Sequence, residues 1–285
     1  MNINTDTKII GLLGYPLGHS LSSAMQNKAF EKDSLNKIYI PIEVLPQNLE
    51  VVVRGISKMN FDGFNITKPY KIEIMKYLDD IDEYASLIGA VNTVSIKNGI
   101  LKGYNTDGTG FLKSYEEYTS TKIEGKNVFI LGSGGAARSI SMTLALNEAN
   151  KIYIFNRTHE KATALSNDIN NKVGKCSEVI PFIYGEMKKA IDDSDVLINT
   201  TSVGMFPDIE CSPIDKNLLN GNLTVCDVIY NPIKTKMLCD AEKIGCKIVN
   251  GLSMLLYQGT GAYKIWTGKE APADLMLKVL EEGIK

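Results

Sequence analysis

The stretch Lys126-Asn-Val-Phe-Ile-Leu-Gly132-Ser-Gly134-Gly135-Ala-Ala137-Arg138 decides the fold. Its apolar run does not alternate with polar residues, which is typical of a strand buried on both faces, and the glycines that follow permit a tight turn. Gly132, Gly134 and Ala137 fit the Gly-x-Gly-x-x-Gly/Ala spacing, in which a pyrophosphate binds amides at a helix N-terminus. A helix-compatible segment and a second apolar run, Lys151–Phe155, come next. This strand, helix and strand context predicts a Rossmann-type dinucleotide-binding domain.

The residues after the second apolar run distinguish the two nicotinamide cofactors. An NAD site has an acidic residue here for the ribose hydroxyl, whereas an NADP site has cations for the 2′-phosphate. The sequence places Asn156, Arg157 and Thr158 at this point, with Lys161 shortly after, and no carboxylate precedes Glu160. This pattern predicts NADP(H), with Arg157 as a phosphate ligand. The alternative is that Arg157 is an ordinary solvated charge.

Length and composition restrict the class of protein. At 285 residues the chain exceeds the size at which a single core keeps growing, so two domains are expected. A net charge of −2 without a long run of cations argues against a nucleic-acid partner. The polar, acidic first residues do not resemble a signal peptide, and no apolar stretch approaches the ~18 residues of a membrane span. We therefore expect a cytoplasmic protein with no membrane partner.

The cysteines and histidines argue against disulfides and metals. The five cysteines are widely spaced, and the two histidines are His19 and His159. No Cys-x-x-Cys motif occurs, so the sequence predicts reduced thiols and no metal site.

Apolar runs alternate with amphipathic segments along most of the chain, which predicts parallel α/β sheets. Strands are expected at Lys8–Gly14, Ile38–Val44, Phe61–Ile66, Asp195–Asn199, Thr224–Ile229 and Cys246–Val249, and helices at Pro46–Lys58, Gly110–Tyr118, Thr235–Ile244 and in Leu252–Gly283. Asn98-Gly99 between two β segments predicts a hairpin with a type I′ turn. We predict two α/β domains, with the C-terminal helices returning to the first. Residues 1–107 plus 252–285 form a mainly parallel-sheet substrate domain, and residues 108–251 form the Rossmann-like NADP domain.

Three local patterns concern candidate functional residues. Pro69 suits the first position of a helix expected to continue through Ile72–Leu87, which would place Lys71 where the helix dipole opposes an ammonium. Lys71 is therefore either a catalytic group or a surface lysine that tolerates this position. Asp107 precedes a helix and reads as an N-cap unless it has a catalytic role. Ser23 and Gln26 fit a capping box.

Small polar loops follow several of the expected strands. They include Asn199–Gly204, the segment around Tyr230 and the pair Asn250-Gly251. Because ligands of open α/β sheets bind beyond the carboxyl ends of the strands, these loops are candidates to line a nicotinamide pocket. The alternative for each loop is simple turn chemistry.

Taken together, the motifs resemble the shikimate dehydrogenase family along nearly the whole chain. The matching segments are Gly18–Ser22, Asn65–Lys71, Gly89–Thr93, Asn105–Gly108, Gly132–Arg138, Asn156–Thr158, Asn199–Gly204 and Gly251–Gln258. Their shared order makes the resemblance specific. It implies reversible, NADPH-dependent reduction of 3-dehydroshikimate to shikimate in aromatic amino-acid biosynthesis.

The resemblance also implies roles for individual residues. The catalytic pair is Lys71 and Asp107, and either of the two transfers the proton. The substrate carboxylate falls to Ser20 and Ser22 with Tyr230 nearby, and the ring hydroxyls fall to Asn65, Thr67, Asn92 and Gln258. The expected cofactor residues are Glu83, Gly132, Ser133, Gly134, Gly135, Ala136, Asn156, Arg157, Thr158, Lys161, Thr200, Val228 and Gly251. Ser23 and Gln26 depart from the family pattern, in which proline and histidine are usual.

Two other functions remain compatible with the sequence. One is a quinate/shikimate dehydrogenase with broader substrate choice or NAD use, against which the missing acidic residue after Phe155 and the paired Ser20 and Ser22 argue. The other is a non-catalytic, NADP-sensing regulatory protein, which has no need of Lys71 together with Asp107. Whichever of these functions the chain has, shikimate dehydrogenase included, we expect a monomer or a homodimer.

Overall fold

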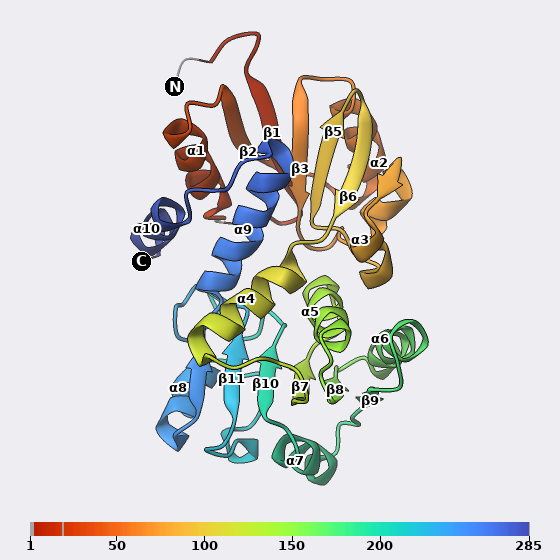
Figure 1. Cartoon of the computed structure of the whole chain (residues 1–285). Coiled ribbons are helices and arrows are strands. Elements are labelled where there is room, and N and C mark those ends of the chain that lie inside the picture. The colour runs from red at the N-terminus through yellow and green to blue at the C-terminus, as the bar shows by residue number, and fades with distance from the viewer. Residues whose placement is uncertain (1–2, 19, 285) are drawn as a thin grey trace. The chain divides into compact units, whose positions relative to one another are not determined.

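The structure is a computed structural model that describes residues 3–18 and 20–284 (Figure 1). It divides into two compact units. The first contains the described residues up to Asp107 together with Leu256–Gly283, and the second contains Gly108–Leu255. His19, which belongs to the Gly18–Ser22 motif, lies outside the described residues.

The first unit is built on a mixed six-stranded sheet of order β2-β1-β3-β5-β6-β4. Its strands are β1 (Lys8–Gly14), β2 (Lys37–Glu43), β3 (Phe61–Ile66), β4 (Asp80–Ile81), β5 (Thr93–Lys97) and β6 (Ile100–Tyr104). β2, β1 and β3 are mutually parallel, while β5 pairs antiparallel with β3 and with β6. The hairpin predicted at Asn98 and Gly99 is confirmed, because both residues have positive φ and Lys97 pairs with Ile100.

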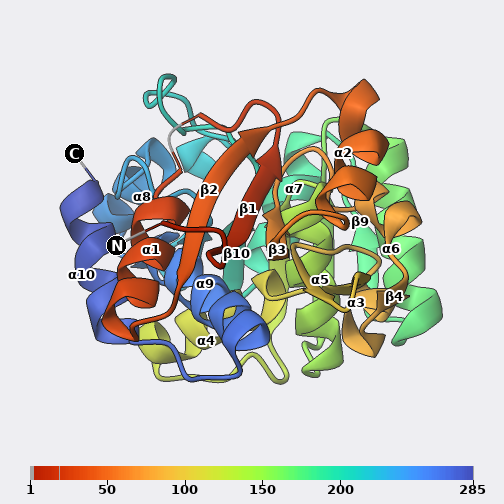
Figure 2. The same ribbon diagram turned by 90° about the horizontal axis from the view of Figure 1, so that it is seen from above.

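Helices cover both faces of this sheet (Figure 2). They are α1 (Ser22–Lys32), η1 (Pro46–Asn48) followed by α2 (Leu49–Ile56), η2 (Glu73–Tyr77), α3 (Glu83–Ile88), α9 (Leu252–Thr267) and α10 (Ala273–Gly283). On one face, α2, η2 and α3 pack against a core that includes Val53 and Phe64. At α1, Phe30 stacks on Tyr263 of α9 with ring centroids 5.5 Å apart. The C-terminal helices thus return to the first unit and pack beside α1.

The helix predicted at Ile72–Leu87 is wrong. The chain forms η2, the short strand β4 and α3 in its place, and Lys71 lies in the turn before η2. The carbonyl of Lys71 accepts a hydrogen bond from the Val91 amide at 2.8 Å, and the Tyr70 side chain is 1% exposed. These tertiary contacts override the local helix signal, so the helix-dipole argument for Lys71 does not apply.

The capping box predicted for Ser23 and Gln26 is also wrong. α1 begins at Ser22, so Ser23 lies within its first turn, and no side chain of a described residue caps the helix. Gln26 is 1% exposed and donates from Nε2 to the Gly259 carbonyl oxygen at 2.9 Å. Its side chain therefore joins α1 to α9 and does not cap α1.

The second unit contains a fully parallel six-stranded sheet of order β12-β11-β10-β7-β8-β9. Its strands are β7 (Asn127–Leu131), β8 (Lys151–Phe155), β9 (Ser177–Val179), β10 (Val196–Asn199), β11 (Thr224–Asp227) and β12 (Lys247–Val249). Read from β9, the order is that of the doubly wound dinucleotide-binding fold, with the switch point between β7 and β10. The Rossmann-type prediction is confirmed.

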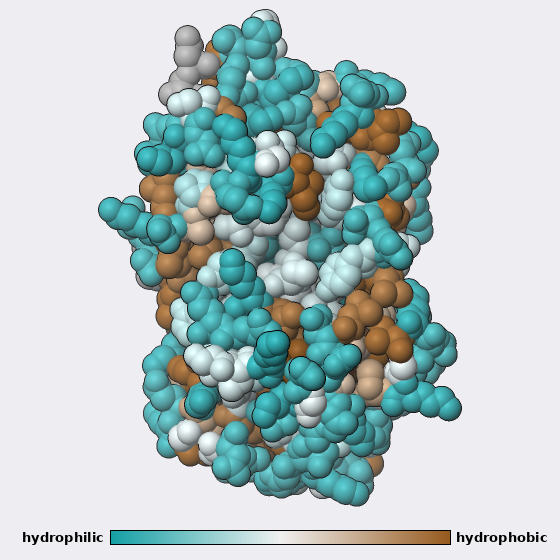
Figure 3. Space-filling model, viewed as in Figure 1, coloured by the Kyte–Doolittle hydropathy of each residue, from teal (hydrophilic) through white to brown (hydrophobic). Residues whose placement is uncertain are grey.

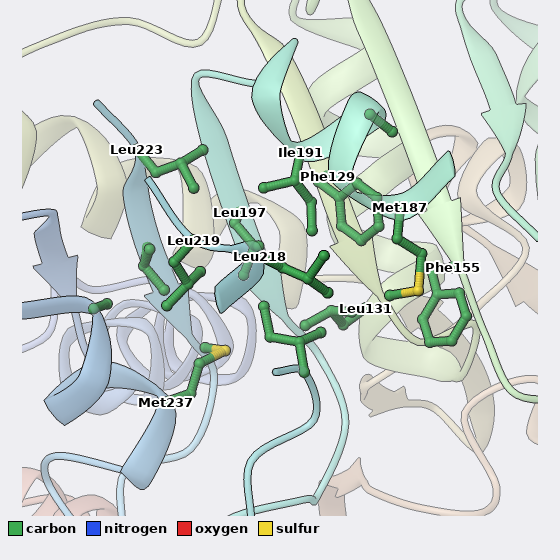
Figure 4. Packing of buried hydrophobic residues seen from close by; sticks show 14 of the residues in the cluster. Phe129, Leu131, Phe155, Met187, Ile191, Leu197, Leu218, Leu219, Leu223 and Met237 are labelled. Carbon is green, nitrogen blue, oxygen red and sulfur yellow. The ribbon is translucent and has the colours of Figure 1, made fainter. Parts of the chain in front are cut away.

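Helices and a buried core complete this unit. The helices are α4 (Asp107–Thr119), α5 (Gly135–Leu146), α6 (His159–Lys172), α7 (Tyr184–Asp192), η3 (Lys216–Leu218) and α8 (Lys236–Ile244). Phe129, Leu131 and Leu197 of the sheet pack with Met187 of α7 and Met237 of α8 (Figure 4). The four residues Val128–Leu131 are at most 1% exposed, as expected for a strand covered on both faces.

One face of the molecule is largely polar. Hydrophilic residues cover most of the face drawn in Figure 3, with smaller apolar patches between them. In the described part of the chain, no helix has both the length and the apolar character needed to cross a membrane. The same residues include no cluster of metal-binding side chains.

Candidate active site

The glycine-rich loop joins β7 to α5 at the switch point of the second unit. Gly132 has φ +113°, and a Cβ at this position would lie 2.6 Å from Thr200 Oγ1. Gly134 is exposed and has open space where a side chain would project. The third position, Ala137, is fully buried in the packing of α5. This arrangement leaves the backbone at the start of α5 open to a pyrophosphate.

A polar, cationic segment follows β8 at the same edge of the sheet. Asn156 is half-buried and donates from Nδ2 to the Thr158 carbonyl oxygen at 2.9 Å. Arg157 and Lys161 are exposed, and neither forms an ion pair with another described residue. Both cations are therefore available to an anionic ligand beyond the end of β8.

The loops after β10, β11 and β12 lie against the glycine loop and one another. Thr200 donates from Oγ1 to the Leu131 carbonyl oxygen at 2.6 Å. The Val228 amide donates to the Asn199 carbonyl oxygen at 3.1 Å. A Cβ at Gly251 would lie 2.2 Å from the Val228 carbonyl oxygen, so only glycine permits this approach. Three of the predicted cofactor residues, Thr200, Val228 and Gly251, thus belong to one continuous set of backbone contacts.

Lys71 and Asp107 meet in the first unit. Lys71 Nζ lies 2.6 Å from Asp107 Oδ2, and the two side chains are 16% and 6% exposed. Asn92 donates from Nδ2 to the other carboxylate oxygen, Oδ1, at 3.0 Å. The Asp107 amide donates to Asn105 Oδ1 at 3.1 Å. One carboxylate oxygen therefore accepts from a neutral amide while the other faces a cation, which is a geometry suited to proton transfer.

Two predicted substrate residues belong to the same buried network. Asn92 Nδ2 also donates to Thr106 Oγ1 at 2.8 Å, and its Oδ1 accepts from the Thr106 amide at 2.8 Å. Asn65, at the end of β3, donates from Nδ2 to the Asn92 carbonyl oxygen at 3.0 Å and to Thr93 Oγ1 at 2.9 Å. The Tyr39 hydroxyl donates to Asn65 Oδ1 at 2.8 Å. The network joins β2, β3, β5 and the start of α4.

The remaining predicted substrate residues of this unit lie on its loops and on α9. The Ser22 amide donates to Ser20 Oγ at 3.3 Å. Burial raises the pKa of Tyr39, and a hydrogen bond with the Ser22 side chain partly opposes this rise. Thr67 is half-buried after β3, with its amide donating to the Leu13 carbonyl oxygen at 2.9 Å. Gln258 is half-buried on α9.

Two predicted site residues, one for the substrate and one for the cofactor, lie in a different unit from the other residues predicted to bind the same ligand. Tyr230 is half-buried just after β11 in the second unit, whereas the other predicted substrate residues belong to the first. Glu83 is exposed at the start of α3 in the first unit, whereas the other predicted cofactor residues belong to the second. The roles of both residues stay predictions.

Sequence reasoning gave no role to several side chains that organise these groups. Tyr39 is one, and the others are Asn105, Thr106, Asp227 and Thr235. A signal existed for Asp227, because it interrupts the apolar run Thr224–Ile229 with a carboxylate near the carboxyl end of a strand. No comparable signal marks Tyr39, since tyrosine is common in strands.

The doubly wound sheet, the glycine loop at its switch point and the lysine–carboxylate pair define an oxidoreductase that uses a dinucleotide. Residues 12–94 match the family described as shikimate dehydrogenase substrate binding domain. Residues 115–207 match shikimate / quinate 5-dehydrogenase, and residues 251–281 match the shikimate 5'-dehydrogenase C-terminal domain. The chain belongs to the shikimate dehydrogenase family.

Similar proteins cover the full chain. The NADP(+) shikimate dehydrogenase of Methanocaldococcus jannaschii is 45% identical over 284 residues, which is 99% of each chain. A crystal structure of shikimate dehydrogenase in complex with NADP+ has a TM-score of 0.92 at 43% identity, covering 100% of this chain and 98% of that one. The Listeria monocytogenes shikimate 5-dehydrogenase, in complex with shikimate and NAD, has a TM-score of 0.90 at 39% identity, covering 98% of each chain.

Proposed function

We propose that this chain catalyses the reversible, NADPH-dependent reduction of 3-dehydroshikimate to shikimate in the shikimate pathway. The observation that carries the proposal is the pair formed by Lys71 Nζ and Asp107 Oδ2, 2.6 Å apart within an amide network. The family membership of the whole chain supports the substrate and cofactor. The free state of all five cysteines supports a cytoplasmic location. A monomer or homodimer is proposed, which sedimentation would distinguish.

The chemistry requires a hydride at the ring carbonyl carbon and a proton at the carbonyl oxygen. NADPH, when bound, supplies the hydride. Lys71 and Asp107 supply the proton. One of the two groups donates it to the carbonyl oxygen as negative charge develops there, and the other stabilises the donor after it has lost the proton. In the reverse direction the same pair removes the proton from the shikimate hydroxyl. Asn92 keeps the Asp107 carboxylate oriented toward Lys71 throughout, and Asn105 anchors the Asp107 backbone amide.

The proposed substrate site uses neutral polar groups around this pair. A polyhydroxylated ring requires amides and hydroxyls, and a site built from them rejects analogues that lack a partner group. Ser20 and Ser22, together with Tyr230, are proposed to bind the carboxylate. Asn65, Thr67, Asn92 and Gln258 are proposed to bind the ring hydroxyls.

The proposed cofactor site follows the carboxyl edge of the parallel sheet. The residues assigned to the pyrophosphate are Gly132, Ser133, Gly134, Gly135 and Ala136. Asn156, Arg157, Thr158 and Lys161 are assigned to the 2′-phosphate and its ribose, and Glu83, Thr200, Val228 and Gly251 to the nicotinamide half. The exposed cations support the 2′-phosphate assignment, because a charge-assisted contact favours NADP over NAD.

The direct test is to measure the oxidation of shikimate with NADP⁺ and with NAD⁺ in parallel assays. The absorbance of the reduced nicotinamide monitors the reaction. Hydrogen bonds to a charged group contribute about 1.5–3 kcal/mol, so we expect kcat/KM to favour NADP⁺ by about 10- to 100-fold. Binding of NADPH without turnover of shikimate would refute the proposed function and favour a regulatory protein.

Arg157→Ala tests the phosphate assignment within the same assay. We expect the KM for NADP⁺ to rise about 10-fold or more while the KM for NAD⁺ changes little, because only NADP⁺ carries the 2′-phosphate. Lys175→Ala, which removes another exposed cation of the same unit, is the matched control. Equal losses for both cofactors would place the 2′-phosphate elsewhere.

A broader quinate/shikimate dehydrogenase is the second candidate. Residues 115–207 match a family whose description includes quinate dehydrogenases, and this match supports the second candidate. Kinetics with quinate in place of shikimate decide between the two. We expect kcat/KM for shikimate to exceed that for quinate, and comparable values would establish the broader activity.

A further inference from the structure

Asp227 is a buried carboxylate whose partners are all uncharged. It is the last residue of β11 and is 2% exposed. Oδ1 accepts from the Ile229 amide at 3.0 Å, and Oδ2 accepts from Thr235 Oγ1 at 2.8 Å. Asn199 Nδ2 lies 3.1 and 3.2 Å from the two oxygens. Because a buried carboxylate without a cation is costly, this site is held by several hydrogen bonds at once.

Through Asn199, Asp227 determines the shape of the loop after β10. Asn199 Oδ1 accepts from the Thr201 amide at 3.0 Å and from Thr201 Oγ1 at 2.7 Å. Asn199 Nδ2 also donates to the Val203 carbonyl oxygen at 3.3 Å. Thr200 lies between these anchored residues, and its Oγ1 reaches the Leu131 carbonyl beside the glycine loop.

Through Ile229, the same carboxylate determines the path of the chain after β11. The Asp227–Ile229 bond forms a tight turn that includes Val228. The Gly251 amide donates to the Ile229 carbonyl oxygen at 3.0 Å, and Gly251 packs on the Val228 backbone. Thr235, the third partner, is the N-cap of α8 and accepts from the Leu238 amide at 3.4 Å.

We propose that Asp227 is a positioning residue for the nicotinamide half of the cofactor site. Its carboxylate holds together the loops that carry Thr200 and Val228, and it thereby fixes the place where hydride transfer occurs. The identity of the ligand rests on the proposed function, whereas the coupling of the loops rests on the hydrogen bonds alone. No hydrogen bond between described residues joins Asp227 to the glycine loop or to Arg157, so the adenosine half of the site should not depend on it.

The experiment compares Asp227→Asn with the wild-type protein in two assays. The first is calorimetric binding of adenosine 2′,5′-bisphosphate, which probes the adenosine half alone, and of NADP⁺, which probes both halves. The second is steady-state oxidation of shikimate and of shikimate deuterated at the reacting carbon. In the variant, an amide N–H replaces one acceptor and faces donor groups of Asn199 or Thr235, so the loops must move.

We expect Asp227→Asn to bind the bisphosphate within about twofold of wild type while kcat falls at least ~10-fold, since small misplacements of reacting groups are costly. NADP⁺ binding should weaken relative to the bisphosphate, and the deuterium effect on kcat should grow as hydride transfer becomes limiting. Asp195→Asn is the matched control, because Asp195 accepts from the Asn127 amide at 2.9 Å at the amino end of the same sheet. It should leave all readouts unchanged.

A second pair of variants covers the case in which Asp227→Asn does not fold. Thr235→Val removes the hydroxyl donor to Oδ2, and Thr235→Ser keeps it. The valine variant should bind the bisphosphate normally and show a smaller fall in kcat than Asp227→Asn. The serine variant should have the kcat of wild type. Equal weakening of NADP⁺ and bisphosphate binding, or an unchanged kcat, would overturn the proposal. If wild type does not oxidise shikimate, the proposed function fails, and the two binding constants still decide the role of Asp227.

Discussion

Each unit of this protein buries a carboxylate at the end of a strand or the start of a helix, Asp107 in the first unit and Asp227 in the second, and these two carboxylates have different partners. Asp107 in the first unit lies 2.6 Å from the Lys71 ammonium. Asp227 in the second unit accepts hydrogen bonds from an amide side chain, a backbone amide and a hydroxyl. A neighbouring cation provides a transferable proton, whereas neutral donors only orient the group. We infer that the same residue type serves proton transfer in one unit and loop positioning in the other.

The largest expected effect comes from removing the cation beside Asp107. Lys71→Ala should lower kcat for shikimate oxidation at least ~10²-fold with a modest change in KM, which is the scale of a general acid–base contribution. Steady-state kinetics measure it, with Lys68→Ala as the control because Lys68 is an exposed lysine three residues before Lys71. Near-wild-type turnover in the Lys71 variant would mean that the cation beside Asp107 has no role in proton transfer, and the proposed difference in role between Asp107 and Asp227 would be lost.

The second prediction concerns the pH dependence that Asp227 introduces. Burial raises the pKa of Asp227 from 3.8 to about 6, although its hydrogen bonds partly oppose this rise. Below 3.8 both folded and unfolded chains bind the proton, and between the two values only the folded chain retains it. Asp227 therefore contributes stability at low pH that is lost as the pH rises through about 6. The shift corresponds to about 3 kcal/mol.

Urea unfolding of wild type and Asp227→Asn between about pH 4 and pH 7 measures this contribution, because asparagine does not titrate. The unfolding free energy of wild type should fall relative to the variant by about 2.4 kcal/mol across this range, which is most of the full shift. A difference that stays constant with pH would mean that burial does not disfavour the Asp227 anion. The contrast with the cation-paired Asp107 would then be lost.

The fold of the second unit was predictable because its signals are local. The unbroken apolar run before Gly132 and the glycine spacing each specify a strand or a turn without reference to distant residues. The structure of the segment from Lys71 to Ile88 was not predictable, because a contact between the Lys71 carbonyl and the Val91 amide decides its path. Propensity favoured one helix there, and tertiary contacts replaced it with η2, β4 and α3.

The residues of the candidate site that lie in sequence motifs were predictable. Those whose position depends on strand register were not. Lys71 and Asp107 lie 36 positions apart, and resemblance to a family, not spacing, suggested the pair that the structure brings together. Tyr39 reaches Asn65 because β2 and β3 flank β1 in parallel register. The sequence contains no signal for that register at single-residue precision, so Tyr39 could not be assigned in advance.

The third prediction asks whether neutral donors in the first unit also act by positioning. Tyr39→Phe removes the hydroxyl that donates to Asn65 Oδ1 at 2.8 Å and contacts Ser22. A neutral hydrogen bond contributes about 0.5–1.5 kcal/mol, so the KM for shikimate should rise about 3- to 10-fold while kcat changes little. Tyr118→Phe, at a tyrosine that is 57% exposed, is the control. A fall in kcat at constant KM would instead place the Tyr39 hydroxyl with Lys71 in the chemistry.

The smallest expected effect lies at Ser23, which adjoins both the predicted carboxylate site and the Tyr39 network without joining either. Its Oγ is buried and has no hydrogen-bond partner among the described residues. Ser23→Ala removes an unsatisfied polar group and improves helix propensity in α1, so the free energy of unfolding should rise by about 0.5–1 kcal/mol. Ser22→Ala should have the opposite sign, because the neighbouring hydroxyl does bond to Tyr39. Urea unfolding of the two variants compares adjacent serines of one helix, and a destabilised Ser23 variant would mean that its hydroxyl has a partner in solution.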